Sequence, residues 1–291
     1  MEEPVKASAF AYVKPTSLSD VFELFEQYGD AAQILAVGQS LIAALNMRLA
    51  APAVLIDINS LTDLAGISVS NDTVRIGALA RHRSLEHSAE IARCLPLIHQ
   101  AMPHVAHAAI RNRGTFGGSI AYADPAAELP ACSVALDATL QLASKSGERS
   151  VPARQFFKGL YETDLRPGEV LLGGEFRALQ PGYRSAFLEL ARRHGDYAIV
   201  GVAAHGKFEG GRFSDASVVF FGISAVPVLA VSAAAALEGN PCSPDTVAAV
   251  QAAVSEDLEP YGDLYHSAAT KLHLARVLAG RIVNALAGTA S

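Results

Sequence analysis

Hydrophobic and polar residues alternate over the first sixty positions between a strand pattern and a helix pattern. A short apolar run at residues 10–13 ends before Pro15, and a helical pattern then extends from Ser17 to Gly29. Continuous apolar runs at residues 34–37 and 54–58 predict two buried strands, with a helix over residues 41–49 between them. Because strands and helices alternate here, we expect a small βαβ-type layer.

The pattern changes after about residue 60. A strand is predicted at residues 74–76, followed by several helices between residues 84 and 110. Residues 145–148 (KSGE) predict a hairpin turn, and residues 180–182 (QPG) predict a linker. Beyond this linker, strands at residues 200–208 and 217–223 are joined by residues 209–211 (EGG) and precede three alanine-rich helical segments. This order of strands and then helices is typical of an α+β unit.

Composition excludes several classes of protein. The 291 residues are 51% hydrophobic and 18% charged, which excludes a disordered or collagen-like chain, and the formal net charge is -6, with 23 basic against 29 acidic residues, which argues against nucleic-acid binding. Cys94, Cys132 and Cys242 are too far apart for a CxxC-type metal site and predict a reducing compartment. Residues 1–4 (MEEP) lack signal-peptide features, and no stretch reaches the roughly 18 apolar residues of a membrane span. We therefore expect a cytoplasmic protein without a membrane span.

Two glycine-containing segments are the candidate binding loops. In both, free main-chain N–H groups could contact an anion, and in the segment at residues 115–119 two adjacent glycines allow a close approach. Either segment alone is also typical of an ordinary turn. Together they could hold one pyrophosphate from two sides. Loop 1 consists of Ala36, Val37, Gly38, Gln39, Ser40 and Leu41, and loop 2 consists of Thr115, Phe116, Gly117, Gly118 and Ser119.

Other site chemistries find little support in the sequence. Neither loop matches the GxGxxG dinucleotide fingerprint or the GxxxxGK[ST] phosphate loop. His104 and His107 have no acidic third ligand at a recognised spacing and no HExxH motif, so no metal site is predicted. Ser40 and Ser119 lack the GxSxG elbow of a nucleophilic serine. No side chain is predicted to act as a catalytic acid, base or nucleophile.

Four segments, in this order, resemble a known family. The sequence is similar over almost its whole length to the FAD-binding subunit, or medium chain, of the molybdenum hydroxylases, the family of carbon monoxide dehydrogenase and xanthine dehydrogenase. Four matching segments are far more specific than either loop alone. They are residues 38–41 (GQSL), 77–82 (GALARH), 110–119 (IRNRGTFGGS) continued by 123–130 (ADPAAELP), and 192–198 (RRHGDYA).

The resemblance implies an α+β fold with two cofactor-binding subdomains. This is the FAD-binding fold of the p-cresol methylhydroxylase and vanillyl-alcohol oxidase type, followed by a C-terminal α+β domain with a small antiparallel sheet. Residues 1–58 would form FAD-binding subdomain 1, residues 59–178 subdomain 2, and residues 183–291 the C-terminal domain of the flavoprotein subunit.

The resemblance also implies which residues hold FAD. Loop 1 and, in loop 2, Thr115, Gly117, Gly118 and Ser119 would bind the pyrophosphate. The remaining contacts would come from Asp124 and Glu128 near the sugar and ribityl hydroxyls, Leu171 and Leu172 at the adenine or the ring edge, and Tyr197 close to the isoalloxazine. Two positions depart from the family pattern: Val37 stands where relatives commonly have a glycine, and Glu189 stands near a position where many have Lys.

The activity implied by the resemblance is electron transfer. FAD in this chain would receive electrons from 2Fe-2S clusters of a small subunit and pass them to an external acceptor, while a large subunit with the molybdenum cofactor hydroxylates the substrate. The complex would be a heterotrimer, or a dimer of heterotrimers, acting on N-heterocycles, nicotine-like compounds, carbon monoxide or aldehydes. A self-contained flavin-dependent oxidase of the same fold class and a nonenzymatic scaffold are the alternatives.

Overall fold

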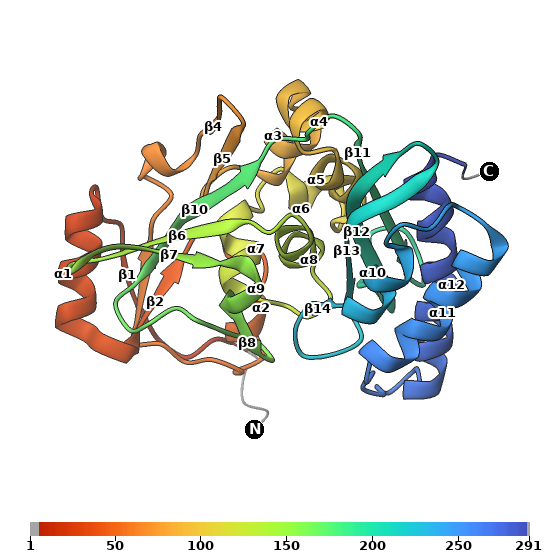
Figure 1. The fold of residues 1–291 in the computed structure, drawn as a ribbon. Coiled ribbons are helices and arrows are strands. Elements are labelled where there is room, and N and C mark those ends of the chain that lie inside the picture. The colour runs from red at the N-terminus through yellow and green to blue at the C-terminus, as the bar shows by residue number, and fades with distance from the viewer. Residues whose placement is uncertain (1–5, 290–291) are drawn as a thin grey trace.

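The computed structural model describes residues 6–289, which form three main sheets surrounded by helices (Figure 1). The N-terminal residues 1–4, considered above for signal-peptide features, lie outside the described residues. The first sheet is parallel, with strand order β1-β3-β2, and confirms the predicted βαβ-type layer. Its strands are β1 (Ala11–Val13), β2 (Ala32–Leu35) and β3 (Val54–Asp57), and its helices are α1 (Leu18–Tyr28) and α2 (Leu41–Asn46).

Local sequence explains where α1 begins and ends. Ser17 and Asp20 form a capping box, in which each side chain accepts a hydrogen bond from the other residue's main-chain N–H. Gly29 follows the helix with φ at 53°, and the 3-10 turn η1 (Gly29–Ala31) leads into β2. Helix α2 is shorter than the predicted 41–49, because Arg48 adopts a left-handed conformation with φ at 57° and turns the chain toward β3.

The second sheet is antiparallel and has the order β4-β5-β10-β6-β7. The predicted helical region between residues 84 and 110 consists of several short helices, because turns interrupt it. The strands are β4 (Ile67–Ser70), β5 (Thr73–Gly77), β6 (Thr139–Ser144), β7 (Gly147–Pro152) and β10 (Val170–Arg177), and the helical segments are η2 (Thr62–Leu64), α3 (His82–His87), α4 (Ala89–Cys94), α5 (Pro96–Ala101), η3 (Met102–His104), α6 (Ala108–Arg111), α7 (Phe116–Tyr122) and α8 (Glu128–Ala135). Helix α9 (Ala153–Phe156) and the small hairpin of β8 (Phe157–Gly159) and β9 (Glu162–Thr163) lie between β7 and β10 in the chain.

The third sheet, order β11-β12-β13-β14, is antiparallel and lies beside helices of the C-terminal part (Figure 1). Its third strand begins five residues before the predicted 217–223, because Gly210 and Gly211 form a tight turn with positive φ values and pairing resumes at once between Glu209 and Arg212. The elements are β11 (Tyr183–Leu190), β12 (Val200–Glu209), β13 (Arg212–Phe221), β14 (Val228–Leu229), α10 (Val231–Leu237), α11 (Pro244–Asp257) and α12 (Ala268–Ala287).

The third sheet joins the rest of the molecule through one of its faces. Phe187 of β11 and Phe221 of β13 belong to the same buried cluster as Leu129 of α8, whereas Ala186 of β11 is buried with Leu278 of α12 on the other face. The main-chain N–H of Gly222 donates to the carbonyl of Pro125 at 2.9 Å across the same junction. These contacts fix the segment between β11 and β12 beside the start of α8. The assignment of residues 1–58, 59–178 and 183–291 to separate domains stays a prediction.

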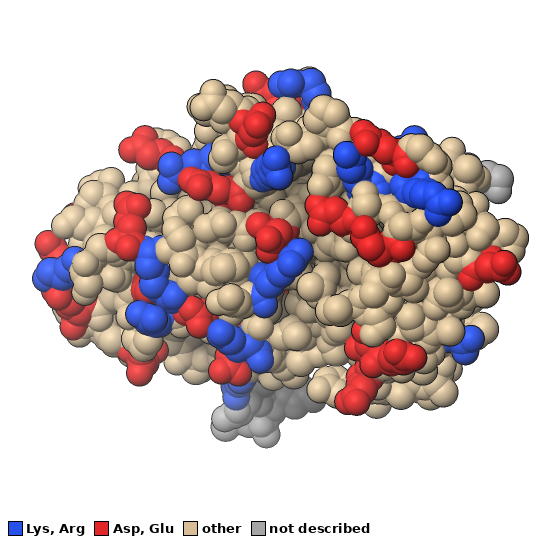
Figure 2. All heavy atoms as spheres, in the orientation of Figure 1, with Lys and Arg blue, Asp and Glu red and all other residues tan. Residues whose placement is uncertain are grey.

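Acidic and basic side chains are interspersed on the face shown in Figure 2. Among residues 6–289, no helix combines the length and the apolar character needed to cross a bilayer.

Candidate functional site

Loop 1 follows β2 directly and leads into α2. Gly38 has φ at 76°, a conformation that favours glycine, and a Cβ there would lie 2.4 Å from Cγ1 of Ile42. Within residues 6–289, no main-chain N–H of residues 37–41 donates to a protein acceptor; the first intrahelical bond here is from Ile42 to the Gly38 carbonyl. Loop 1 therefore presents five consecutive main-chain donors that a bound anion could use.

Loop 2 has the opposite arrangement of hydrogen bonds. Thr115 caps α7, and a Cβ on Gly117 would lie only 2.5 Å from Cβ of Ala78, so this glycine is needed for close packing. All four amides that follow Thr115 are satisfied inside the protein. Phe116 donates to the Ala80 carbonyl (2.9 Å), Gly117 to the Ala78 carbonyl (2.8 Å), Gly118 to Thr115 Oγ1 (3.1 Å) and Ser119 to the Thr115 carbonyl (3.1 Å).

Loop 2 consequently offers hydroxyl groups rather than amides. The Thr115 hydroxyl accepts from Gly118 and keeps its own proton for a further acceptor. The side chain of Ser119 is half-buried and makes no hydrogen bond to the described part of the chain. The adjacent glycines expected to expose amides instead allow the start of α7 to pack against the segment around Ala78.

Arg81 connects the loop 2 segment to Asn59, which follows β3. Its guanidinium donates to Asn59 Oδ1 at 3.0 Å and to the Arg113 carbonyl at 2.6 Å, and its main chain forms an isolated bridge with Thr115. Asn59 follows β3, whose Asp57 pairs in parallel with Leu35 immediately before loop 1. Because the carboxyl ends of parallel neighbours lie at one edge of a sheet, loop 1 and loop 2 are held at the same side of the molecule.

The buried side chain of His82 supports loop 2 through a hydrogen bond to its main chain. It is 6% exposed, and its Nε2 lies 2.9 Å from the Thr115 carbonyl, so Nε2 carries the proton and donates it. Burial lowers the pKa of His82 to about 4, which keeps the ring neutral, and its Nδ1 is buried without a hydrogen-bond partner. Arg81 and His82 lie in one of the segments that resemble the family, but the sequence predicted no role for either. The residues around Asn59 contain no motif that predicts its contact with Arg81.

Asp124 lies between α7 and α8, and Glu128 is the first residue of α8. The left-handed conformation of Ala123 ends α7, and Asp124 then accepts the N–H of Ala126 at 2.9 Å and the Tyr161 hydroxyl at 3.5 Å. Burial raises the pKa of Asp124. Glu128 is 8% exposed, and burial together with the negative charge of Glu189 raises its pKa to about 8. The structure thus places an acidic cluster of Asp124 and Glu128 next to helix α7, which loop 2 begins.

Tyr197, in the segment between β11 and β12, lies close enough to Asp124 and Glu128 for their charges to act on it. Its side chain is 71% exposed, and its main-chain N–H donates to Asp196 Oδ1 at 3.0 Å. The rings of Tyr122 and Tyr161 meet edge to face with centroids 5.2 Å apart. These aromatic side chains leave a surface against which a flat ring system could pack.

Leu171 and Leu172 are both packed in the interior of the protein. Both are buried on β10, Leu171 in the cluster that contains Phe116 and Leu172 in the cluster around Val21. The Leu172 carbonyl accepts the N–H of Ala78 at 2.8 Å and so supports the segment against which loop 2 packs. The structure shows a packing role for both leucines, and their contact with the cofactor stays a prediction.

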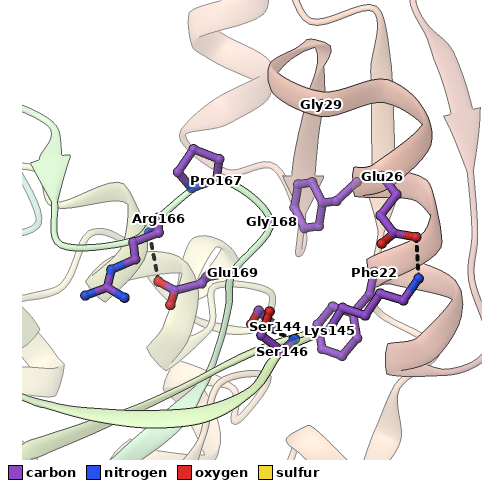
Figure 3. Close-up of a pocket in the computed structure, with 11 residues that line it drawn as sticks. Phe22, Glu26, Gly29, Ser144, Lys145, Ser146, Arg166, Pro167, Gly168 and Glu169 are labelled. Carbon is purple, nitrogen blue, oxygen red and sulfur yellow. Dashed lines mark hydrogen bonds and ion pairs between the residues drawn. The ribbon is translucent and has the colours of Figure 1, made fainter.

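A separate cavity of about 400 Å³ lies between α1 and the β6–β7 hairpin (Figure 3). Phe22 and Phe25 line one side, and Lys145 reaches across to form an ion pair with Glu26. No residue of loop 1 or loop 2 lines this cavity. It is therefore distinct from the candidate site.

Both halves of the chain match known families. Residues 8–173 match the FAD binding domain in molybdopterin dehydrogenase, and residues 185–286 match the CO dehydrogenase flavoprotein C-terminal domain. The first match contains loop 1, loop 2, Asp124 and Glu128. The second match contains Glu189 and Tyr197.

Relatives of known function match over nearly their full length. The 6-hydroxypseudooxynicotine dehydrogenase complex subunit alpha of Paenarthrobacter nicotinovorans is 37% identical, covering 95% of this chain and 94% of its own. A chain of carbon monoxide dehydrogenase from Hydrogenophaga pseudoflava superposes with a TM-score of 0.94 at 34% identity, covering 98% and 99% of the two chains. A chain of quinoline 2-oxidoreductase from Pseudomonas putida 86 has a TM-score of 0.92 at 38% identity, covering 98% and 100%. The chain therefore belongs to the FAD-binding medium subunits of the molybdenum hydroxylases, and its α+β fold is the one that the resemblance implied.

Proposed function

We propose that this chain is the flavoprotein subunit of a heterotrimeric molybdenum hydroxylase, possessing FAD as its own cofactor. Electrons enter from 2Fe-2S clusters of a small subunit and leave to an external acceptor, while the large subunit carries the molybdenum cofactor. Bound FAD supplies the redox chemistry, and the protein supplies binding, orientation and electrostatics.

The observation that carries this proposal is the row of five unpartnered amides in loop 1. Main-chain N–H groups in a turn with a positive φ form a concave site for phosphate oxygens. The hydroxyls of Thr115 and Ser119 complete the pyrophosphate site from loop 2, and Arg81 ties the loop 2 segment to Asn59, beside the strand end from which loop 1 begins. Val37 does not obstruct this arrangement, because the donors are main-chain groups and the left-handed turn falls on Gly38.

The redox ring of FAD is assigned to the side of Tyr197, and the sugar and ribityl hydroxyls are assigned to Asp124 and Glu128. The edge-to-face pair of Tyr122 and Tyr161 and the exposed face of Tyr197 supply aromatic surface, and Asp124 and Glu128 supply oxygen atoms for hydroxyl groups. Leu171 and Leu172 are assigned to the adenine or the ring edge.

The wider assembly follows from the relatives. We infer a dimer of heterotrimers, with the substrate bound by the large subunit. The names of two relatives, a 6-hydroxypseudooxynicotine dehydrogenase and a quinoline oxidoreductase, favour an N-heterocyclic substrate. The three cysteines are free thiols, two of them buried, which supports a reducing cytoplasmic location.

The test is FAD binding by Gly118→Val. A Cβ at Gly118 would lie 2.7 Å from Thr115 Oγ1, so the branched side chain displaces the capping hydroxyl and extends over loop 2. We expect yellow wild-type protein that releases FAD on denaturation, and a folded variant with little or no FAD. Gly66→Val is the matched control, because nothing lies within 4 Å of a Cβ at Gly66.

Two results would contradict the proposal. Full FAD occupancy in Gly118→Val would remove loop 2 from the cofactor site. Reduction of the flavin in the isolated chain by an N-heterocyclic substrate, without partner subunits, would indicate a self-contained oxidase.

A further inference from the structure

Two glutamates from distant parts of the chain lie at the junction between α8 and the third sheet, close enough for the charge of Glu189 to act on Glu128. Glu128 is the first residue of α8 and is more than nine-tenths buried. Glu189 lies near the end of β11, and its Oε2 is fully enclosed without a hydrogen-bond partner in the described residues. An enclosed carboxylate oxygen without a partner is costly, so its charge state needs an explanation.

The alternation of β11 explains why Glu189 points toward α8. Successive side chains of a strand face opposite sides of the sheet. Leu188 and Leu190 pack in the cluster with α12, whereas Phe187 packs in the cluster that contains Leu129, the residue after Glu128. Glu189 shares the face of Phe187 and therefore lies on the side of the sheet that meets α8.

The charged groups around this pair are mostly acidic. Asp124 precedes α8, and its negative charge adds to that of Glu189 at Glu128. Arg111 of α6 is the cation that acts on Glu128, but its guanidinium is committed to Glu86, with hydrogen bonds of 2.8 and 3.0 Å. In residues 6–289, neither Glu128 nor Glu189 forms an ion pair.

We propose that Glu128 and Glu189 share one proton at neutral pH and couple electron uptake by the cofactor to proton uptake from solvent. Two carboxyl groups that repel each other in a largely buried site, with the guanidinium of Arg111 committed to Glu86, do not both ionise at ordinary pH. The raised pKa values of about 8 for Glu128 and about 7 for Glu189, both caused mainly by burial, agree with this geometry.

The coupling rests on the proposed function, which puts the redox ring beside Tyr197, a residue on which the charge of Glu128 acts. Two electrons from the partner's 2Fe-2S clusters add negative charge near the pair. The pair then gains a proton: a solvent acid loses it, and a new O–H bond forms on the carboxylate that was still ionised. When the electrons leave to the external acceptor, that O–H bond breaks and the proton returns to solvent.

The shared proton is tested first, on the full chain without cofactor, by the infrared C=O band of protonated carboxyl groups. We expect the wild type to keep such a band above neutral pH. Glu128→Gln and Glu189→Gln should each lower the pH at which the remaining carboxyl ionises, and the double variant should lose the band. Glu256→Gln, an exposed position on α11, is the control and should leave the band unchanged. Absence of the band in the wild type at neutral pH, or unchanged midpoints in both single variants, overturns the shared proton.

The coupling is tested on the FAD-loaded chain by counting protons taken up per flavin reduced, with a pH indicator. We expect lower uptake, and a midpoint potential less dependent on pH, in Glu189→Gln than in the wild type and Glu256→Gln. Equal uptake in all three overturns the coupling and leaves the flavin assignment intact. A chain that binds no FAD overturns the proposed function and the coupling together, while the infrared band still decides whether the proton is shared.

Discussion

Loop 1 and loop 2 have similar compositions and opposite hydrogen bonding. The amides of residues 37–41 have no protein acceptor among the described residues, whereas the amides of residues 116–119 are all bonded within the protein. Gly38 supplies a left-handed turn, and Gly117 supplies room for Ala78. Glycine is therefore needed for the backbone conformation in loop 1 and for close packing in loop 2.

The difference indicates that the two loops contribute differently to the pyrophosphate site. The main-chain amides of residues 116–119 in loop 2 already have acceptors within the protein, without a ligand. Loop 1 has main-chain donors that only water or a ligand can satisfy. We therefore expect substitution of the packed Gly117 in loop 2 to affect mainly folding and substitution of Gly38 in loop 1 to affect mainly cofactor binding, and the following substitutions test that contrast.

Gly117→Ala should have the largest effect. The new Cβ would lie 2.5 Å from Cβ of Ala78 and 2.8 Å from its carbonyl oxygen, so the main chain has to move and its hydrogen bond to Ala78 is strained. We expect a loss of about 3 kcal/mol in the free energy of unfolding, measured by urea denaturation of the FAD-free chain. The control Gly66→Ala should change it by less than about 0.5 kcal/mol. A wild-type stability for Gly117→Ala would show that loop 2 is not held by this packing.

Gly38→Ala, in contrast to Gly117→Ala, should reduce FAD affinity more than it reduces stability. Its φ of 76° costs an L-residue about 1 kcal/mol, and the side chain of Ile42, which is 37% exposed, can move to make room. We expect a modest loss of stability but a large loss of FAD affinity, measured by calorimetry, because the turn that aligns the amides relaxes.

Gly210→Ala is the matched control for Gly38→Ala. Gly210 has φ at 58° in the β12–β13 turn, with nothing within 4 Å of a Cβ. It should share the loss of stability and keep normal FAD affinity. Equal affinities in the two variants would contradict the role of loop 1.

Much of the fold could be predicted from local patterns. The apolar run at residues 54–58 and the linker at 180–182 correspond to β3 and to the connection between β10 and β11. Two of the differences have local conformational causes: Arg48 ends α2 early by adopting a left-handed conformation, and the glycine turn lets β13 begin at Arg212, before its hydrophobic stretch. The backbone conformation of a single Arg is not encoded in a hydrophobic period.

The two loops of the site could be predicted from the sequence, but the tertiary contacts of the site residues could not. Both loops were found, but whether their amides are free depends on Ala78 and Ala80, which are distant in sequence from loop 2. The Asn59–Arg81 contact and the proximity of Glu128 to Glu189 likewise arise from tertiary packing. Sequence motifs identify the residue types that a ligand needs, and only the folded chain shows which of their polar groups remain available.

Thr115→Ala should have a smaller effect that divides between the two properties. It removes the hydroxyl that caps α7 and leaves the N–H of Gly118 without its acceptor. We expect a loss of about 1 kcal/mol in stability, measured by thermal denaturation, together with weaker FAD binding. Thr115→Ser keeps the hydroxyl and should restore most of both. Failure of Thr115→Ser to improve on Thr115→Ala would show that the methyl group, not the cap, matters.

Ser119→Ala should have the smallest effect and isolates binding from folding within loop 2. The Ser119 side chain makes no hydrogen bond in the described structure, so its removal should change the free energy of unfolding by less than about 0.5 kcal/mol. If its hydroxyl donates to the pyrophosphate, losing one such bond should weaken FAD binding by about 1 kcal/mol, or roughly fivefold in Kd. Calorimetry of FAD binding beside urea denaturation measures both quantities on the same protein. An unchanged Kd would leave the cap hydroxyl of Thr115 as the donor from loop 2 and would make the contrast with the five amides of loop 1 sharper still.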